Sequence, residues 1–365
     1  MKPLRIYFKN FWKGFPTYSN IITYALSMNR TIDIVSATDW TIERNDEKRV
    51  RALHQFGLFS EEPAPDIVFH NGHVQERVPD ALNISWIIEP LLSDRKEVPD
   101  YNICDYSLNS CNFDDSRNHR LPWWSCQINW YAPSYVDKLL EENPNILFCN
   151  NDPPLKMMYN IQLELRRDFS SIDSGRGPYS FIDLDDLYHS QTVSPLCENV
   201  TQRTRDCCSI ASHDMGRRAD FYPEISKHIE VIHAGKFLQN KTKKDVVGIN
   251  YQEKIKFLSN FKSHLCFEND NTDGWITEKI LHAFYAGCLP IYWGPANVYK
   301  DFNEKAFIDI SSFPSSQEAI VYIKEVINND SMLNDYMAQP IFPNNQIPYH
   351  ATPAALNDFF KKIGI

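Results

Sequence analysis

The stretch FENDNTDGWITEKILHAFYAGCLPIYWGP, residues Phe267 to Pro295, carries the clearest information on the fold of this 365-residue chain. It opens as a polar loop, continues with the apolar periodicity of a helix and ends in a short apolar run typical of a buried strand. A helix followed by a buried strand is the repeating element of an α/β fold with a parallel sheet. We therefore expect these residues to lie within such a sheet.

The start of the predicted helix concentrates charged groups. Thr277 stands at the helix start, and Glu278 and Lys279 fall in the first turn. A helix N-terminus offers unpaired N–H groups and a partial positive charge, which favour an anion. Lys279 would add a full charge, and Glu278 could accept hydrogen bonds from two sugar hydroxyls. A nucleoside diphosphate would use both groups, although on spacing alone an ordinary capped helix is the simpler explanation.

The flanking sequence extends the α/β pattern across the second half of the chain. Strand-like runs occur at residues 207–212, 230–235, 264–269, 289–294 and 306–311, and helical patterns occur at 217–229, 251–261, 276–287 and 316–329. This alternation predicts a Rossmann-like domain over residues 146–345. Residues 155–205 lack periodicity and are rich in turn formers, so we expect them to be an insertion.

The first half shows the same alternation. Unalternating apolar runs at residues 4–8, 32–37, 66–71, 83–89 and 101–109 predict buried parallel strands, and a helical pattern covers 18–27. A helix over 134–145 ends at Asn143-Pro144, where we place the end of an N-terminal Rossmann-like domain, residues 1–145. A last helix within residues 346–365 could pack back on the N-terminal domain. The fold class expected is α/β with two Rossmann-like domains.

Composition excludes several classes of function. The net charge of −10 argues against a nucleic-acid partner, which requires a basic surface. No apolar run is long enough to span a membrane, and the start of the chain reads as a strand rather than a signal peptide. The nine cysteines lack zinc-ligand spacing, which favours buried, reduced thiols and a cytoplasmic location.

The opening stretch resembles the donor motif of the α-1,3/4-fucosyltransferases, glycosyltransferase family 10, in their bacterial form. The motif is Phe-x-Glu-Asn, a loop, an aromatic residue, x-Thr-Glu-Lys, an apolar helix and a strand ending in Pro-x-x-x-Gly. The matching positions are Phe267, Glu268, Asn269, Trp275, Thr277, Glu278, Lys279, Pro290 and Gly294. Trp275 departs from the tyrosine more common in bacterial relatives. Weaker resemblance covers most of the chain outside residues 155–205.

The resemblance implies a fold and a donor. It implies the GT-B arrangement, two Rossmann-like domains that face a cleft, with GDP-fucose bound in the C-terminal domain. Asn269, Trp275, Glu278 and Lys279 would then bind the donor. Arg218, three residues before Phe221-Tyr222, matches the arginine that binds the leaving phosphate, and Gly235 would allow close backbone approach to the nucleotide. Since lysine and arginine can neutralise the diphosphate, no metal or other cofactor is expected.

The same resemblance implies an inverting transfer with a general base from the other domain. Glu89 follows the strand-like run NISWII and matches the base of the family. Pro90 stands where the family commonly has asparagine. Asp94 and Glu97 are the alternatives, and a structural role at the strand end is the competing explanation for Glu89.

The implied acceptor is a GlcNAc-containing glycan such as LacNAc or a Lewis-type precursor, joined through an α-1,3 or else an α-1,4 bond, in protein or lipopolysaccharide glycosylation. Membrane contact is expected to be at most peripheral, at the inner face. Two alternatives stay open: a non-catalytic relative that binds sugar or nucleotide, and a transferase for another nucleotide sugar. The aromatic run PWWSCQINWY, residues 122–131, suits either an acceptor platform or the core.

Overall fold

The computed structural model describes residues 4–11, 20–28, 32–39, 65–71, 76–87, 99–112, 114–130, 182–183, 187, 200–242 and 251–365. The chain divides into two compact units, Met1–Asp173 with Tyr349–Ile365, and Ser174–Pro348. The domain junction expected at residues 145–146 and most of the insertion expected at 155–205 lie outside the described residues.

The first unit is built on a parallel sheet with the strand order β2-β1-β3-β4-β5-β6. Its elements are β1 (Leu4–Phe11), α2 (Asn20–Ser27), β2 (Ile32–Asp39), β3 (Ile67–Asn71), β4 (Leu82–Ile87), β5 (Tyr106–Asn109), β6 (Asn118–Arg120) and β7 (Ile128–Asn129). Strand β4 is buried from Asn83 to Ile87, as its unbroken apolar run predicts. The run expected at 101–109 is a strand only from Tyr106, because residues 101–103 form a turn closed by Asp100.

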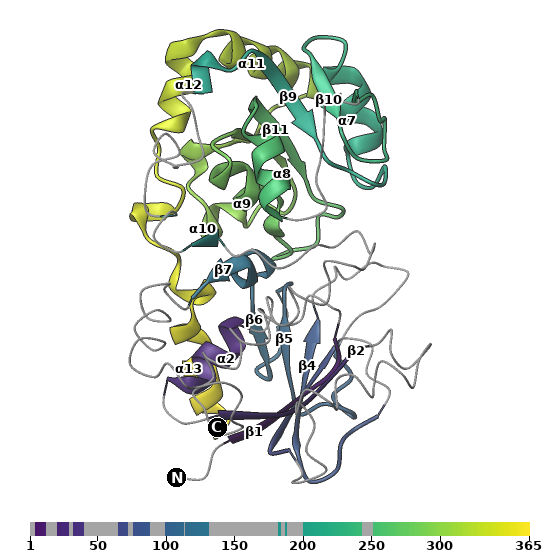
Figure 1. The fold of residues 1–365 in the computed structure, drawn as a ribbon, viewed down its shortest axis with the longest axis vertical. Helices are drawn as coiled ribbons and strands as arrows, with labels where there is room; N and C mark the ends of the chain where they lie inside the picture. The colour runs from purple at the N-terminus through teal and green to yellow at the C-terminus, as the bar shows by residue number, and fades with distance from the viewer. Residues whose placement is uncertain are drawn as a thin grey trace. The chain divides into compact units, whose positions relative to one another are not determined.

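Helix α13 (Pro353–Lys362) belongs to the first unit although it lies near the end of the sequence. Figure 1 shows it beside α2. The Phe360 ring lies edge-on to Phe69 of β3 at 6.2 Å between centroids, and the Phe359 ring lies edge-on to Tyr106 of β5 at 6.1 Å. The helix therefore covers apolar surface of this sheet.

The aromatic run at residues 122–130 belongs to the core of the first unit. Trp123, Trp124 and Trp130 are 9%, 0% and 8% exposed. The indole N–H of Trp130 donates to the carbonyl of Ser125 at 2.9 Å. Because these rings are enclosed by protein, they offer no platform for an acceptor sugar, and the core interpretation of this run is correct.

The second unit has a parallel sheet in the order β10-β9-β11-β12-β13. Its strands are β8 (Ile182–Asp183), β9 (Arg205–Ser209), β10 (Val231–His233), β11 (Phe261–Phe267), β12 (Leu289–Trp293) and β13 (Ile308–Asp309). Its helices are α7 (Arg218–Ile225), α8 (Tyr251–Leu258), α9 (Glu278–Tyr285), α10 (Val298–Asp301), α11 (Ser316–Asn328) and α12 (Asp330–Met337). Apart from β8, α10 and α12, each matches a pattern read from the sequence.

The core of the second unit forms where α11 and α12 pack on the sheet. Ile320, Ile323 and Ile327 of α11 and Leu333 of α12 join apolar residues of β11 and β12. The seven described cysteines are all buried thiols, as expected. None of the helices in the described ranges is both long and apolar enough to cross a bilayer.

Candidate functional site

The strand order of the second unit locates a binding site before any side chain is considered. The first strand of this sheet, β9, lies between β10 and β11. The chain passes from β9 to β10 on one side, and the later strands β11, β12 and β13 follow on the other side. The strand order therefore reverses between β9 and β11. Ligands of open α/β sheets bind at this switch point, beyond the carboxyl ends of the strands. Glu268 directly follows β11, and the segment after β9 leads to Arg218 at the start of α7.

Glu268 is a fully buried carboxylate that organises the start of α9. One oxygen, Oε1, accepts from the backbone N–H of Thr277 at 2.8 Å, and Oε2 accepts from the Thr277 hydroxyl at 2.7 Å and from Lys279 Nζ at 3.0 Å. Its negative charge sits at the positive end of the helix, where it is stabilised. Because its oxygens are committed to these donors, Glu268 is a positioning residue.

Lys279 projects from the first turn of α9 and is held by two acceptors. Its Nζ donates to Glu268 and, at 2.7 Å, to the Thr277 hydroxyl, and it lies 5.7 Å from the centre of the Trp275 ring. Burial lowers the pKa of Lys279, but the negative charges of Glu268 and Glu278 outweigh it and raise the pKa. An ammonium group has three donors, so one remains for a ligand.

Glu278 is the second acid at this helix end. Burial opposes its ionisation, yet the positive charges of Lys279 and Lys254 outweigh that effect and lower the pKa of Glu278 to about 2. Lys254 of α8 donates to His282 Nδ1 at 2.8 Å. Burial, reinforced by the charge of Lys254, lowers the pKa of His282 well below its usual range, so the ring is neutral at pH 7. Glu278 is therefore ionised and able to accept from hydroxyls.

Arg218 is a buried cation whose hydrogen bonds are incomplete. It is 3% exposed; Nη2 donates to the carbonyl of Phe267 at 2.5 Å and Nη1 to that of His213 at 3.4 Å. Its Nε is buried without a hydrogen-bond partner, and within the described ranges no carboxylate forms an ion pair with it. Since a buried unpaired cation is costly, the site is suited to an anionic ligand.

The neighbouring arginine, Arg217, differs from Arg218 in its hydrogen-bond partner. Arg217 donates through Nη2 to the hydroxyl of Ser316, at the start of α11, at 2.6 Å. The repulsion between Arg218 and Lys279 counters part of the rise in the Lys279 pKa, so these two cations lie within electrostatic reach of each other. Of these two adjacent arginines, the structure thus brings Arg218, the predicted donor residue, toward the α9 cluster.

The other residues predicted for the site are Trp275, Asn269, Gly235 and Glu89. Trp275 is 3% exposed beside Lys279, and Asn269 is half-buried in the loop that follows Glu268. A Cβ on Gly235 would lie 2.0 Å from the carbonyl oxygen of Ala211, so the close approach of that backbone already requires glycine here. Glu89 lies outside the described residues, two positions beyond the end of β4.

Sequence reasoning did not assign several residues that shape the site. Glu268 and Gly294 were recognised only as motif positions, and Lys254 and His282 were not noticed. A Cβ on Gly294 would lie 2.9 Å from Glu268 Cγ and 2.3 Å from the Tyr292 hydroxyl, so this glycine makes room for the buried carboxylate. The available signal was an acid directly after an apolar strand, followed nine to eleven residues later by Thr-Glu-Lys.

Comparison with known proteins agrees with this geometry. Residues 200–339 match the model of the glycosyltransferase family 10 (fucosyltransferase) C-terminal domain. The α-(1,3)-fucosyltransferase FucT of Helicobacter pylori is 41% identical over 241 residues, 62% of this chain and 42% of the relative. A putative fucosyltransferase of Acanthamoeba polyphaga mimivirus is 25% identical over 272 residues, 73% of this chain and 42% of the relative. The chain thus spans less than half the length of these curated relatives.

Solved structures resemble the chain along nearly its whole length. A crystal structure of an α1,3-fucosyltransferase with GDP-fucose has a TM-score of 0.61 at 21% identity, covering 99% of this chain and 90% of that one. A crystal structure with GDP has the same TM-score at 22% identity. These likenesses confirm the predicted fold class, and the sequence matches confirm the resemblance to family 10.

Proposed function

We propose, from the match of residues 200–339 to the family 10 glycosyltransferase domain, that this chain transfers L-fucose from GDP-fucose to a glycan acceptor. The observation that carries the proposal is the pair of cations at the switch point of the second sheet. Arg218 is buried without an anionic partner, and Lys279 retains one unused donor. A nucleoside diphosphate supplies the negative charge that Arg218 lacks, and acceptor oxygens for the open donors of both residues.

The donor half of the reaction follows from these residues. Arg218 and Lys279 would bind the diphosphate and stabilise the charge that develops on GDP as the glycosidic bond breaks. Glu278, ionised and beside Lys279, would accept hydrogen bonds from the ribose hydroxyls, while Trp275 and Asn269 would line the donor. Two fixed cations perform the task that a metal ion performs in other transferases, so activity should survive EDTA.

The acceptor half rests on Glu89. An inverting transfer needs a base that removes the proton of the acceptor hydroxyl as it attacks the anomeric carbon. Glu89 follows β4, whose buried core residues lead to the carboxyl edge of the first sheet. Residues at this edge of an open α/β sheet are those that meet ligands. We propose Glu89 as this base, with Asp94 and Glu97 as the alternatives.

The linkage and acceptor are proposed from the relatives. The Helicobacter pylori relative is named an α-(1,3)-fucosyltransferase. A rat 4-galactosyl-N-acetylglucosaminide 3-α-L-fucosyltransferase is 29% identical over 186 residues, 50% of this chain and 47% of the relative. We therefore propose α-1,3 transfer to the GlcNAc of a LacNAc-type glycan. A bacterial source, a cytoplasmic location and at most peripheral membrane contact stay predictions.

The test is a transfer reaction with defined substrates. The purified chain is incubated with GDP-fucose and LacNAc, with and without EDTA, and the product linkage and anomeric configuration are determined by NMR. We expect an α-1,3 product, formed with inversion of the donor configuration and in equal yield with EDTA. GDP binding without any transfer would support the non-catalytic alternative, and turnover with GDP-mannose but not GDP-fucose would support a different donor.

A further inference from the structure

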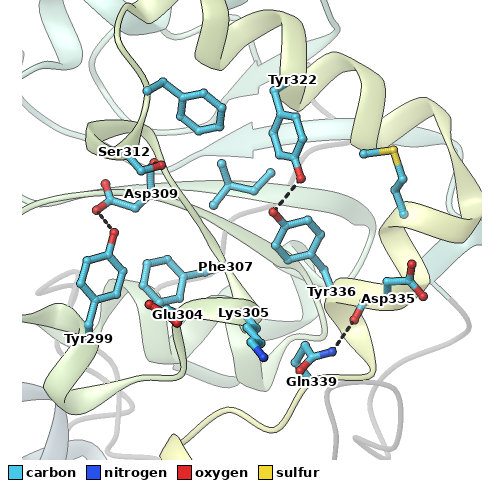
Figure 2. Close-up of a pocket in the computed structure, with 13 residues that line it drawn as sticks. Tyr299, Glu304, Lys305, Phe307, Asp309, Ser312, Tyr322, Asp335, Tyr336 and Gln339 are labelled. Atoms are coloured by element: carbon cyan, nitrogen blue, oxygen red, sulfur yellow. Dashed lines mark hydrogen bonds between the residues drawn. The ribbon is translucent and has the colours of Figure 1, made fainter.

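A second pocket, whose lining includes no residue of the donor motif, lies in the second unit (Figure 2). Its volume is about 580 Å³. It is lined by residues of α10, the edge strand β13, the middle of α11 and α12, and by short segments that adjoin them: Tyr299, Glu304, Lys305, Phe307, Ile308, Asp309, Ser312, Phe313, Tyr322, Met332, Asp335, Tyr336 and Gln339. None of these residues belongs to the donor cluster of Arg218, Glu268, Glu278 and Lys279.

Aromatic side chains supply most of the apolar surface of this pocket. Tyr299 stacks on Phe307 at 5.9 Å between centroids, and Phe313 packs against Tyr322 at 5.3 Å. Figure 2 shows Tyr322 and Tyr336 on the opposite side from Tyr299 and Phe307. Tyr299 is 38% exposed, so its ring is accessible to a ligand. Rings held in this way offer flat apolar faces at little cost in side-chain entropy.

The polar groups of the pocket are held in fixed positions and keep unused capacity. Asp309 accepts from the Tyr299 hydroxyl at 2.7 Å and from the backbone N–H of Ser311 at 2.8 Å. The hydroxyls of Tyr322 and Tyr336 are 3.0 Å apart. A carboxylate has about four acceptor sites and each phenol oxygen also accepts, so these oxygens can bind further hydroxyl donors.

The mixture of donors and acceptors indicates the class of ligand. Lys305 and the Gln339 amide bring donors, while Asp309, Glu304 and Asp335 bring acceptors. A quaternary ammonium ligand would use the rings and the acids, but it would make no use of the donors and would be repelled by Lys305. A neutral molecule with an apolar face and a rim of hydroxyls uses every one of these groups. That is the chemistry of a pyranose sugar.

We propose that this pocket is a saccharide-binding subsite, which holds a sugar unit of the glycan acceptor remote from the unit that receives fucose. The inference rests on the proposed function for its biological role, but saccharide binding can be measured without turnover. Its consequence is that long glycans are better acceptors than short ones. Tyr299 would stack on the sugar, and Asp309 and Gln339 would bind its hydroxyls.

The direct test uses a hexasaccharide of three LacNAc units, without GDP-fucose. We expect saturation-transfer NMR to show contact with the chain, and hydrogen exchange to show protection of residues 299–313. The protection of residues 299–313 should be reduced in Tyr299→Ala and kept in Tyr349→Ala, a matched control because Tyr349 is an exposed tyrosine outside the pocket. Undiminished protection of residues 299–313 in Tyr299→Ala, or protection elsewhere only, would overturn the proposal. So would a response of the pocket to tetramethylammonium but not to the hexasaccharide.

A kinetic test separates this inference from the proposed function. The ratio of kcat/KM for the hexasaccharide to that for the single disaccharide should fall about fivefold in Tyr299→Ala, the order of one aromatic contact, and stay unchanged in Tyr349→Ala. An unchanged ratio in Tyr299→Ala would contradict the subsite. Hexasaccharide binding that depends on Tyr299, in a chain that transfers no fucose, would refute the proposed function and leave the saccharide site standing.

Discussion

The two sheets share the order of their first five strands, and one buried polar side chain from each unit, Asn83 and Arg218, shows two ways in which such a group can be satisfied. In the first unit, Asn83 Oδ1 lies 2.7 Å from His70 Nε2 and accepts from the Val78 N–H at 2.9 Å. The Asn83 amide donates to the carbonyls of Val78 and Ala81 at 2.9 and 2.8 Å. All four hydrogen-bonding positions of this side chain are used. In the second unit, buried Arg218 keeps an unpartnered Nε.

A buried polar side chain can stabilise the fold or bind a ligand, and its hydrogen bonds indicate which. A satisfied group such as Asn83 stabilises the fold, and its removal leaves its partners unsatisfied. A buried charge with unused donors, such as Arg218, contributes less to the fold and is suited to a ligand that completes its bonds. Variants of the two kinds should therefore affect different measurements, stability in one case and binding or turnover in the other.

The largest effect is expected at Glu89, which tests whether the first unit also carries chemistry. Glu89→Gln keeps the shape of the side chain and removes the base, so kcat should fall by about 10²–10⁴ while GDP-fucose affinity changes little. Steady-state kinetics and a GDP-fucose titration on the same preparation measure both. Near-parental turnover would move the base to Asp94 or Glu97, and these variants serve as the comparison.

Asn83→Ala should act on stability alone. Its removal leaves the Val78 and Ala81 backbone groups and the His70 ring without their partner, which should lower the free energy of unfolding by about 2–4 kcal/mol. Turnover per folded molecule should be unchanged. Asn102→Ala, at an exposed position, is the control in urea unfolding. A loss of turnover with intact stability would contradict the structural role of Asn83.

Lys279 is expected both to stabilise the fold, through its ion pair with Glu268, and to bind the ligand. Lys279→Met leaves the Glu268 carboxylate without its cation; because Lys279 is itself 20% exposed, we expect a loss of about 1–3 kcal/mol in unfolding free energy. Adding Glu268→Gln should recover part of that stability without restoring GDP binding. Recovery of binding in the double variant would show that Lys279 acts only by neutralising Glu268.

The smallest effect concerns pH and Glu278. Its pKa is about 2 in the folded chain and near 4.5 ordinarily. A lowered pKa contributes stability that is fully present above pH 4.5 and is lost as the pH falls toward 2. The difference in unfolding free energy between the parent and Glu278→Gln should therefore be constant from pH 7 to about 5 and shrink below that. A difference that already changes between pH 7 and 6 would contradict the assignment.

The fold and the donor motif could be predicted because their determinants are contiguous in sequence. Residues 261–294 contain a strand, a loop, a helix and the next strand, so period and spacing suffice. Helix α12 was not anticipated, because one residue, Asn329, ends α11 and caps α12 through the N–H groups of Ser331 and Met332. The sequence pattern predicts one helix over residues 316–329 and gives no sign of a second helix directly after it.

Side-chain partners from distant segments were not predictable. Lys254 meets His282 only after α8 and α9 pack together, and Gly235 owes its identity to the Ala211 backbone, 24 residues earlier. The aromatic residues of the second pocket lie on elements that meet only after the unit folds. The periodicity of apolar residues along the sequence carries no information on such long-range contacts.

The central claim, that Arg218 is a buried cation completed by the donor diphosphate, is tested most directly by calorimetric titration of GDP into two variants. Arg217→Gln and Arg218→Gln change adjacent arginines, of which only Arg218 is buried without a full set of partners. We expect parental affinity in Arg217→Gln and a loss of about 1.5–3 kcal/mol in Arg218→Gln, with both variants folded by circular dichroism. Equal GDP affinity in the two variants would contradict the account.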